Sequence, residues 1–472
     1  MRKYAGLGAI NRVHFIGIGG VSMSGLAEIL FKDGFKVTGS DRTASAATRH
    51  LQDVGINIKI GCDEKDITPD IELVVYNAAI KPENPERAAA AKMGIPTMVR
   101  AELLGVILQG FDYPVCIAGS HGKTSTTALV TAIAKEGGLD PTVNIGGYVE
   151  TEGKNNYIGE SPYFVLEACE YSNSFHHWHP HIGVILNVDA DHMDFYGSMD
   201  AIIDSFAKFA SNIKPGAALI IQEGAKGFDK IVAGLDCEII TFRTDQENQE
   251  VPAPKKGILR QYWVRDVAHG ADGTTSFDVM LNAVFQARVT FPLPGEYNMY
   301  NALAAFAAGQ ELGIEAPIIA KALSRAKGVK RRYEYKGEYN GITIIDDYAH
   351  HPTEIKACLA AARKTEPKRI ICLFQPHTYT RTRNHFEDFS HAFAGADMTM
   401  FLPIYAAREQ HDPTISSAML ADAVAENGHV AINCNSFEEA EEMLRGKLMP
   451  GDLLITMGAG ESYIVGEALL AR

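Results

Sequence analysis

The segment that most constrains the fold of this chain lies at residues 114–127 and reads PVCIAGSHGKTSTT. An apolar run at 115–118 precedes the glycines, and apolar residues recur with helical spacing over 128–134. This order predicts a buried strand, a glycine loop and a helix. Glycines allow a tight turn in which successive N–H groups point inward, and a helix N-terminus adds partial positive charge. The segment therefore predicts a phosphate-binding loop made of Gly119, Ser120, His121, Gly122, Lys123, Thr124 and Ser125.

Two side chains of this loop suit a nucleoside triphosphate. Lys123 supplies a full positive charge for the β- and γ-phosphates, and the Thr124 hydroxyl can coordinate a phosphate-bound Mg²⁺. The usual pattern G-x-x-x-x-G-K-[ST] needs a glycine at position 117, where this chain has Ile117, so the loop is shorter than usual. The alternative is an ordinary glycine turn with a solvated Lys123.

Length, charge and cysteine content limit the class of protein to which the chain can belong. A length of 472 residues predicts about three domains. The net charge of −14 argues against a nucleic-acid partner. Seven cysteines without a C-x-x-C pair indicate reduced thiols, and no run of 18 apolar residues or signal peptide is present. We expect a soluble cytoplasmic protein with no membrane partner.

The first third of the chain contains a second glycine loop. A strand at 13–16, the glycines Gly17, Gly19 and Gly20, a helix at 22–31 and a strand at 35–38 predict a βαβ unit. Asp41 stands where such units place a carboxylate that contacts a ribose, although a solvated carboxylate is the alternative. Further on, a strand at 73–76 leads into Asn77 and Ala78, whose small size allows close approach to a ligand, and a strand at 96–99 precedes Arg100.

Acidic residues and a histidine follow two strands of the middle third. Glu167 comes directly after the apolar run 164–166, and the segment 189–194, which includes His192, follows the run 182–186. Ligands bind at the carboxyl ends of strands in open α/β sheets, and oxygen donors near a phosphate loop suit Mg²⁺. An acidic surface loop is the alternative. The histidine-rich stretch SFHHWHPH at 174–181 lacks paired metal-ligand spacing, so we do not predict a zinc site there.

Charged and polar residues dominate over 223–286, and some stretches alternate with a period of two. This pattern predicts a β-rich elaboration with a hairpin turn at Asp272 and Gly273. A helix then begins near Asn298 and Asn301, which share one face of its first turn. Capping of the helix by Asn298 is the alternative.

The last third begins at a basic, glycine-marked junction at 328–333. In it, Thr353 is placed to cap a helix at 354–363, and a strand at 370–374 is followed by Arg381 and Arg383, which suit a carboxylate or phosphate. We predict an α/β protein of three domains: a Rossmann-like domain at 1–108, a central P-loop ATPase-like mononucleotide-binding domain with a β-rich elaboration at 109–327, and a Rossmann-like domain at 328–472.

Several motifs occur in order along the chain: A-G-S-H-G-K-T, E-A-C-E, N-V-D-A-D-H-M-D, P-G-E-Y-N-M-Y-N, R-R-Y, D-D-Y-A-H-H-P-T-E and Q-P-H-T-Y-T-R-T-R. Together they resemble the Mur ligase family over essentially the full length. The resemblance implies an ATP-dependent amide ligase of peptidoglycan synthesis that uses Mg²⁺. In that reaction ATP phosphorylates the lactyl carboxylate of UDP-N-acetylmuramate, and the amine of L-alanine attacks the acyl phosphate. We expect a monomer or weak homodimer.

The resemblance also implies roles for individual residues. Lys123 would serve the ATP phosphates, with Thr124, Glu167 and His192 as metal ligands. Asn298 and Asn301 would face the adenine, and Arg332 and Asp347 would complete the nucleotide site. The UDP-sugar would contact a larger set: Gly17, Gly19, Gly20, Ser22, Met23, Ser24, Asp41, Asn77 and Ala78. His351, Arg381 and Arg383 would approach the muramoyl substrate or the incoming amino acid. The residues expected to be catalytic are Lys123, Glu167, His192, His351 and Arg381.

The chain departs from the family pattern at several positions, among them Ser120 of the phosphate loop, where threonine is commoner. Cys169 and Ser172 stand where many relatives have acidic residues, and Thr378 stands where many have arginine. These departures bear on the amino-acid preference. The alternatives are a sibling ligase that adds a peptide or another amino acid, an NAD-dependent oxidoreductase built on the first glycine loop, and a nucleotide-gated binding protein.

Overall fold

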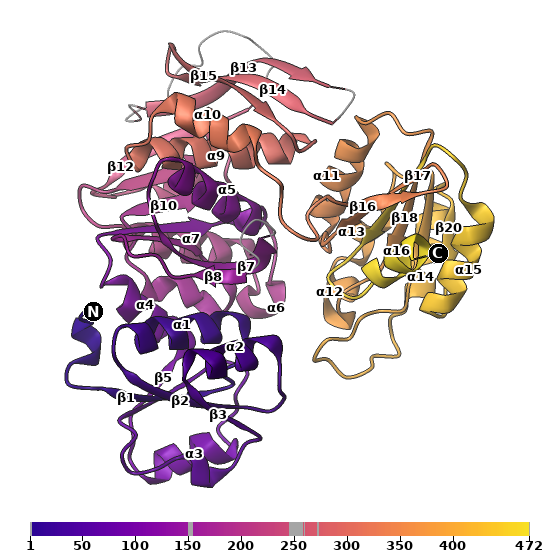
Figure 1. The fold of residues 1–472 in the computed structure, drawn as a ribbon. Helices are drawn as coiled ribbons and strands as arrows, with labels where there is room; N and C mark the ends of the chain where they lie inside the picture. The colour runs from indigo at the N-terminus through magenta and orange to yellow at the C-terminus, as the bar shows by residue number, and fades with distance from the viewer. Residues whose placement is uncertain (1, 150–153, 245–257, 259, 271–272, 472) are drawn as a thin grey trace.

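The chain forms three consecutive α/β units in a computed structural model that describes residues 2–149, 154–244, 258, 260–270 and 273–471. In Figure 1 the first unit lies at the bottom, the central unit above it, and the C-terminal unit at the right. The predicted α/β class with three domains is confirmed, while the domain limits stay predictions. The part of the chain that the structure describes contains no helix long and apolar enough to cross a membrane.

The first unit has a five-stranded parallel sheet in the order β3-β2-β1-β4-β5. The strand order reverses between β1 and β4, and open α/β sheets bind ligands at such a switch point. The predicted glycine loop follows β1 at this point. The elements are β1 (Arg12–Ile16), β2 (Lys36–Asp41), β3 (Asn57–Ile60), β4 (Leu73–Tyr76), β5 (Thr97–Val99), α1 (Val21–Lys32), α2 (Ala46–Val54), α3 (Pro85–Lys92), α4 (Arg100–Leu108), η1 (Ala5–Leu7) and η2 (Glu64–Asp66).

The central unit has a ten-stranded sheet in the order β15-β14-β13-β12-β11-β10-β6-β9-β7-β8. It is parallel from β13 to β7, and antiparallel pairs add β8 at one edge and β14 and β15 at the other. Its strands are β6 (Tyr113–Ala118), β7 (Thr142–Val149), β8 (Lys154–Tyr157), β9 (Tyr163–Glu167), β10 (Ile182–Ile185), β11 (Ala218–Gln222), β12 (Glu238–Arg243), β13 (Arg260–His269), β14 (Thr275–Leu281) and β15 (Val284–Phe291). Its helices are α5 (Lys123–Glu136), η3 (Tyr171–His177), α6 (Met193–Tyr196), α7 (Met199–Ser211), α8 (Phe228–Ile231), α9 (Glu296–Glu311) and α10 (Ala316–Ser324).

The strands β13–β15 form the predicted β-rich elaboration, at the top of Figure 1. Asp272 of the predicted hairpin turn lies outside the described residues. Strand β6 shows why the sheet is buried on both sides. Val115 and Ile117 join one apolar cluster with α5 and α9, whereas Cys116 and Ala118 join another on the opposite face.

The C-terminal unit has a six-stranded sheet in the order β16-β17-β21-β18-β19-β20, parallel except for the antiparallel β16. Its strands are β16 (Glu334–Tyr339), β17 (Ile342–Asp347), β18 (Arg369–Phe374), β19 (Met398–Phe401), β20 (Ala431–Asn433) and β21 (Asp452–Met457). Its helices are α11 (Pro352–Arg363), α12 (Tyr379–Asn384), α13 (Phe386–Ser390), α14 (Ser417–Glu426), α15 (Phe437–Lys447) and α16 (Tyr463–Leu470).

The cap predicted for α11 is wrong by two residues. The helix begins at Pro352, and the Nδ1 atom of His351 accepts a hydrogen bond from the Thr353 N–H at 3.3 Å. Proline is favoured at the first helical position because it lacks the N–H that would remain unpaired there. Thr353 is therefore inside the first turn, and its hydroxyl is free to bond elsewhere.

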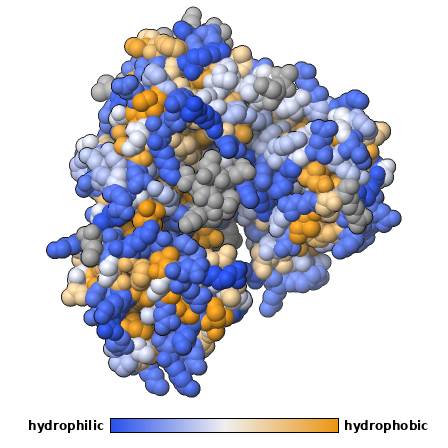
Figure 2. Space-filling model, in the orientation of Figure 1, coloured by the Kyte–Doolittle hydropathy of each residue, from blue (hydrophilic) through white to orange (hydrophobic). Residues whose placement is uncertain are grey.

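One apolar core joins the first and central units. It contains Leu104 and Ile107 of α4 together with Phe164, Trp178 and Phe206 of the central unit. The Trp178 indole N–H donates to the Ala101 carbonyl at 3.1 Å across this contact. The C-terminal unit has two apolar clusters of its own. In the space-filling view an open notch separates it from the first unit, and it meets the central unit above the notch (Figure 2).

Candidate active site

The glycine loop 119–122 lies between β6 and α5, and Lys123 is the first residue of that helix. The Lys123 ammonium donates to the Gly119 carbonyl at 2.6 Å, the Ser120 carbonyl at 3.1 Å and Glu170 Oε1 at 3.0 Å. Burial alone would lower the pKa of Lys123, but the negative charge of Glu170 raises it above its usual value. Lys123 therefore carries a full positive charge at the mouth of the loop.

Thr124 and Glu167 present oxygen atoms side by side next to the loop. The Thr124 hydroxyl donates to Glu167 Oε1 at 3.0 Å, and the Gly146 N–H donates to Glu167 Oε2 at 2.7 Å. Glu167 is the last residue of β9, so the sheet fixes its position at the carboxyl edge. A hydroxyl and a carboxylate oxygen beside a phosphate loop fit Mg²⁺, which takes few protein ligands together with phosphate oxygens.

His192 is expected from the sequence to be a metal ligand together with Glu167, whereas the structure groups His192 with Glu170 and Asp191. Donor atoms of Glu170, Asp191 and His192 all lie within 4.8 Å of one another. His192 Nε2 lies 3.7 Å from Glu170 Oε1 and 3.7 Å from Asp191 Oδ2. Sequence reasoning did not single out Glu170 and Asp191, although both stand in quoted motifs at the ends of strands.

Arg381 reaches this group from the C-terminal unit. Its Nη2 donates to Asp191 Oδ1 at 3.3 Å, and its Nη1 lies 2.9 Å from His377 Nδ1. Burial would raise the pKa of Asp191, but the charges of His192 and Arg381 lower it below its usual value. Asp191 is thus a carboxylate held between the two units.

A cavity of about 240 Å³ opens at this contact. It is lined by Tyr171, Asp191, His192, Met193, His377, Thr378, Thr380, Arg381, Asn384, His385 and Glu409. A cation, a carboxylate and imidazoles around one small space suit a zwitterionic amino acid, whose carboxylate and ammonium need opposite charges. Arg383 does not line this cavity: its side chain is half exposed and pairs with Asp412.

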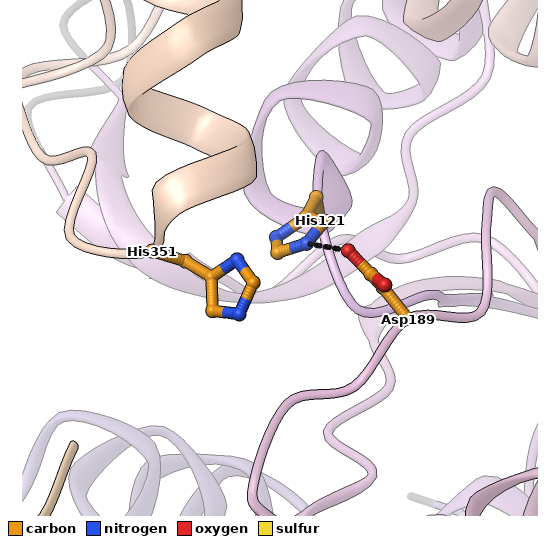
Figure 3. A group of neighbouring side chains, drawn as sticks. All are labelled: His121, Asp189 and His351. Carbon is orange, nitrogen blue, oxygen red and sulfur yellow. Dashed lines mark hydrogen bonds and ion pairs between the residues drawn. The ribbon is translucent and has the colours of Figure 1, made fainter. Parts of the chain in front are cut away.

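A second contact between the units involves the loop residue His121 (Figure 3). Its Nε2 lies 3.3 Å from Asp189 Oδ2, and its Nδ1 lies 3.2 Å from Glu354 Oε1 on α11. Burial would lower the pKa of His121, but these two carboxylates raise it to about 9. Both ring nitrogens therefore carry protons and donate. Thr353 extends the contact, since its hydroxyl donates to Asp189 Oδ2 at 3.0 Å.

His351 lies beside His121, as Figure 3 shows, with ring centroids 5.1 Å apart. His121, Asp189 and His351 form a group close enough to hold a metal ion. An ion there would compete with the proton that His121 holds between two carboxylates, so the geometry suits an ion pair better. Burial lowers the pKa of His351 to about 4. Its ring is neutral, and its buried Nε2 has no hydrogen-bond partner among the described residues.

A cavity of about 390 Å³ lies beside the phosphate loop. Seven of the residues predicted for the nucleotide line it: His121, Gly122, Ser125, Asn298, Asn301, Arg332 and Asp347. The other four, Gly119, Ser120, Lys123 and Thr124, are not among its lining residues. Asn298 lies inside the first turn of α9, where its Nδ2 donates to the Pro294 carbonyl at 2.7 Å, so it is not the cap of that helix. Burial raises the pKa of Asp347 to about 6, and two backbone N–H groups hold its carboxylate.

Close packing joins this cavity to the loop. Gly122 has φ +85°, and a Cβ there would lie 2.5 Å from Asn301 Oδ1. Any side chain at this position would have to displace Asn301 and would also be strained by the left-handed backbone, so glycine is favoured here. Helix α9 sets the position of the loop, and the cavity is large enough for most of an adenosine.

The first glycine loop is held by β2. The Gly17 and Ile18 N–H groups both donate to the Ser40 carbonyl, and the Gly19 N–H donates to Asp41 Oδ2 at 2.8 Å. Asp41 therefore shapes the loop in addition to any contact with a ligand. The Met23 side chain is buried in the core, so only its backbone can meet a ligand.

The remaining predicted residues of this site have local contacts. Ser24 donates to the Val21 carbonyl at 3.0 Å, and Asn77 Oδ1 accepts from the Ala79 N–H at 2.9 Å. Ser22 is the exception, because its hydroxyl accepts a hydrogen bond from Arg100 Nη1 at 3.0 Å. Gly20 directly precedes α1, and Ala78 lies two residues after the end of β4.

Three family models match the chain in order. They are the Mur ligase family catalytic domain over residues 12–112, the Mur ligase middle domain over 117–309, and the Mur ligase glutamate ligase domain over 331–460. A protein of Clostridium novyi named UDP-N-acetylmuramate–L-alanine ligase is 45% identical over 459 residues, which cover 97% of each chain. A protein of the same name from Agathobacter rectalis is 44% identical over 460 residues, which cover 98% of each chain.

Solved structures agree with these matches. The UDP-N-acetylmuramate–alanine ligase of Thermotoga maritima superposes with a TM-score of 0.77 at 26% identity over 98% of each chain. A murein peptide ligase of Psychrobacter arcticus superposes with a TM-score of 0.68 at 23% identity over 98% of each chain, which shows a shared fold only.

Proposed function

The chain belongs to the Mur ligase family, as its motifs predicted, and from this premise we propose that it joins L-alanine to UDP-N-acetylmuramate with hydrolysis of ATP to ADP and phosphate. The observation that carries the proposal is identity of 45% over 97% of the chain with a ligase of that name. The relatives give no support to an NAD-dependent oxidoreductase or to a binding protein without catalysis.

The two cavities supply the spaces that this reaction needs. ATP would place its adenosine in the larger cavity and its phosphates on the loop at Lys123. The smaller cavity, at Arg381 and Asp191, would take L-alanine. Asp191 and His192 line the smaller cavity, and Glu170 of their group pairs with Lys123 of the loop whose residues line the larger one, so the phosphoryl donor and the amine would meet at one place.

The chemistry has two steps. A lactyl carboxylate oxygen attacks the γ-phosphorus of ATP, and ADP leaves. The nitrogen of L-alanine then attacks the acyl carbon, phosphate leaves with the acyl–oxygen bond pair, and the nitrogen loses a proton. Phosphoryl transfer depends mainly on position and on neutralised charge. Lys123 supplies that charge at the loop, and Arg381 would orient the amino acid through its carboxylate.

Mg²⁺ would neutralise phosphate charge and fix the orientation of the γ-phosphate. Thr124 and Glu167 are the residues that fit it best, because their oxygens already point to one spot beside the loop. His192 would contribute from the adjacent group with Glu170 and Asp191. The UDP-sugar would bind the first unit at the loop 17–20, with Ser22, Asn77 and the backbone of Met23.

The test is phosphate release from ATP in the presence of Mg²⁺ and UDP-N-acetylmuramate, with L-alanine, D-alanine, glycine or a tripeptide added singly. Release with L-alanine well above the others is the expected result. Release with the tripeptide alone would assign the chain to the peptide-adding branch instead. No release with any acceptor would contradict the proposal.

A further inference from the structure

Arg100 is a partly buried cation without an acidic partner in the described part of the chain. It is the first residue of α4, directly after β5. Its guanidinium makes one hydrogen bond to another described residue, the 3.0 Å contact of Nη1 with the Ser22 hydroxyl. The remaining N–H donors of its fork have no acceptor among the described residues, and no described carboxylate lies within ion-pair distance.

Other cations of the site are compensated. Lys123 pairs with Glu170 at 2.9 Å, and Arg381 pairs with Asp191 at 3.3 Å. Removing a guanidinium from water without a counter-charge is costly, and an anionic ligand would supply the missing charge. In agreement, burial lowers the pKa of Arg100, with the nearby Cys169 thiol opposing this.

The location of Arg100 suits a ligand that spans the first and central units. Ser22 is the second residue of α1, just after the glycine loop 17–20. The Ser22 hydroxyl also lies 3.4 Å from Asn144 Oδ1 on β7 of the central unit. Cys169, on the other side, follows β9 next to Glu170, the partner of Lys123. The guanidinium therefore lies between the two glycine loops.

We propose that Arg100 binds an anionic oxygen group of UDP-N-acetylmuramate, either its diphosphate or its lactyl carboxylate, at the junction of the first and central units. The inference rests on the proposed function, because that substrate must reach from the first loop to Lys123. Both groups present paired anionic oxygens, and the planar guanidinium matches such pairs with two parallel hydrogen bonds. Arg100 would thus fix the position of the substrate between the two glycine loops.

The experiment measures binding by calorimetry in the full-length protein. The variants are Arg100→Met, which keeps the apolar stem, Arg100→Lys, which keeps the charge, and Arg12→Met as a control. Arg12 belongs to the same unit but pairs with Asp70 on the exposed surface at the start of β1. The ligands are UDP-N-acetylmuramate, UDP-N-acetylglucosamine, which lacks the lactyl carboxylate, and UDP.

Arg100→Met is expected to weaken binding of UDP-N-acetylmuramate by roughly ten- to a hundredfold, the usual size of a lost charge-assisted hydrogen-bond pair. Arg100→Lys should recover part of this loss, and Arg12→Met should bind as the wild type does. An equal loss for all three ligands would identify the diphosphate as the partner. A loss confined to UDP-N-acetylmuramate would identify the carboxylate.

Thermal unfolding separates this role from a structural one. Replacing an unpaired buried cation by an apolar side chain should leave the melting temperature of the free protein unchanged or raise it. Unchanged binding of every ligand in Arg100→Met, or a lower melting temperature with equal loss of ATP binding, would overturn the inference. If the wild-type protein bound no UDP-sugar, both the proposed function and the inference about Arg100 would fail. If Arg100→Met kept wild-type turnover and wild-type binding, only the inference about Arg100 would fail.

Discussion

Glu170 is buried and Lys123 is largely buried, and the two are paired in charge. Lys123→Met should therefore have two effects. Turnover should fall at least roughly a hundredfold because the phosphates lose their fixed cation. The free energy of unfolding should fall by roughly 3–5 kcal/mol because Glu170 is left buried and unpaired.

The double variant Lys123→Met/Glu170→Gln separates these effects. Most of the stability should return, because neither charge is left alone, while turnover stays lost. Urea denaturation and phosphate release measure the two quantities. Turnover within tenfold of the wild type in Lys123→Met would contradict the role of this residue.

His351 combines a structural and a proposed catalytic role. Its neutral ring caps α11 through Nδ1, so His351→Ala should reduce the free energy of unfolding by about 1 kcal/mol. His351→Asn can accept the same hydrogen bond and should keep the stability. If His351 also contacts substrate, both variants lose turnover. Wild-type turnover in His351→Asn would assign the residue to capping alone.

At the scale of elements, α9 and the phosphate loop are packed through Gly122. Gly122→Ala should raise the KM for ATP and reduce the free energy of unfolding by more than 2 kcal/mol, roughly the cost of a strained residue plus a steric clash. Gly138 is the matched control, because it has φ +79° with nothing near its Cβ position. Gly138→Ala should cost about 1 kcal/mol and leave the KM for ATP unchanged. Equal kinetics in the two variants would show that the contact with Asn301 does not position the loop.

Most strands of the site could be predicted from the sequence, but one helix cap and the contacts between units could not. Apolar runs in the sequence predicted β1, β4, β6, β9, β10 and β18 and the loops after them, because strand burial and turn chemistry are local. The cap of α11 was predicted wrongly, because histidine is a rare cap and Thr353 is a common one. Contacts such as Arg381 with Asp191 join residues 190 positions apart, and no local pattern encodes such a pair.

At the scale of the whole molecule, His121 couples the phosphate loop to the C-terminal unit through Glu354. The pKa of His121 is raised to about 9, above its ordinary value of 6.5. The stabilising contact is therefore complete below about pH 6.5 and is lost as the pH rises through about 9. Asp189, Asp191, Glu354 and His351 are the titratable groups around it, and the first three stay ionised over this range.

Urea denaturation of the wild type and of His121→Gln at several pH values tests this coupling. The wild type should be more stable near pH 7, and the difference between the two proteins should narrow as the pH rises through about 9. A difference that stays constant from pH 6 to pH 10 would mean that the His121 proton does not contribute.

Leu104 and Ile107 share an apolar core with Phe164, Trp178 and Phe206. This core also affects how the chain folds while it is being synthesised. The first sheet can pair all its strands once α4 has been made, but the partners of this face are encoded about 50–100 residues later. At a synthesis rate of about 5–20 residues per second, the face would stay uncovered on the ribosome for several seconds or more. A chaperone that binds apolar helix faces during translation would find this face of α4 uncovered during that interval.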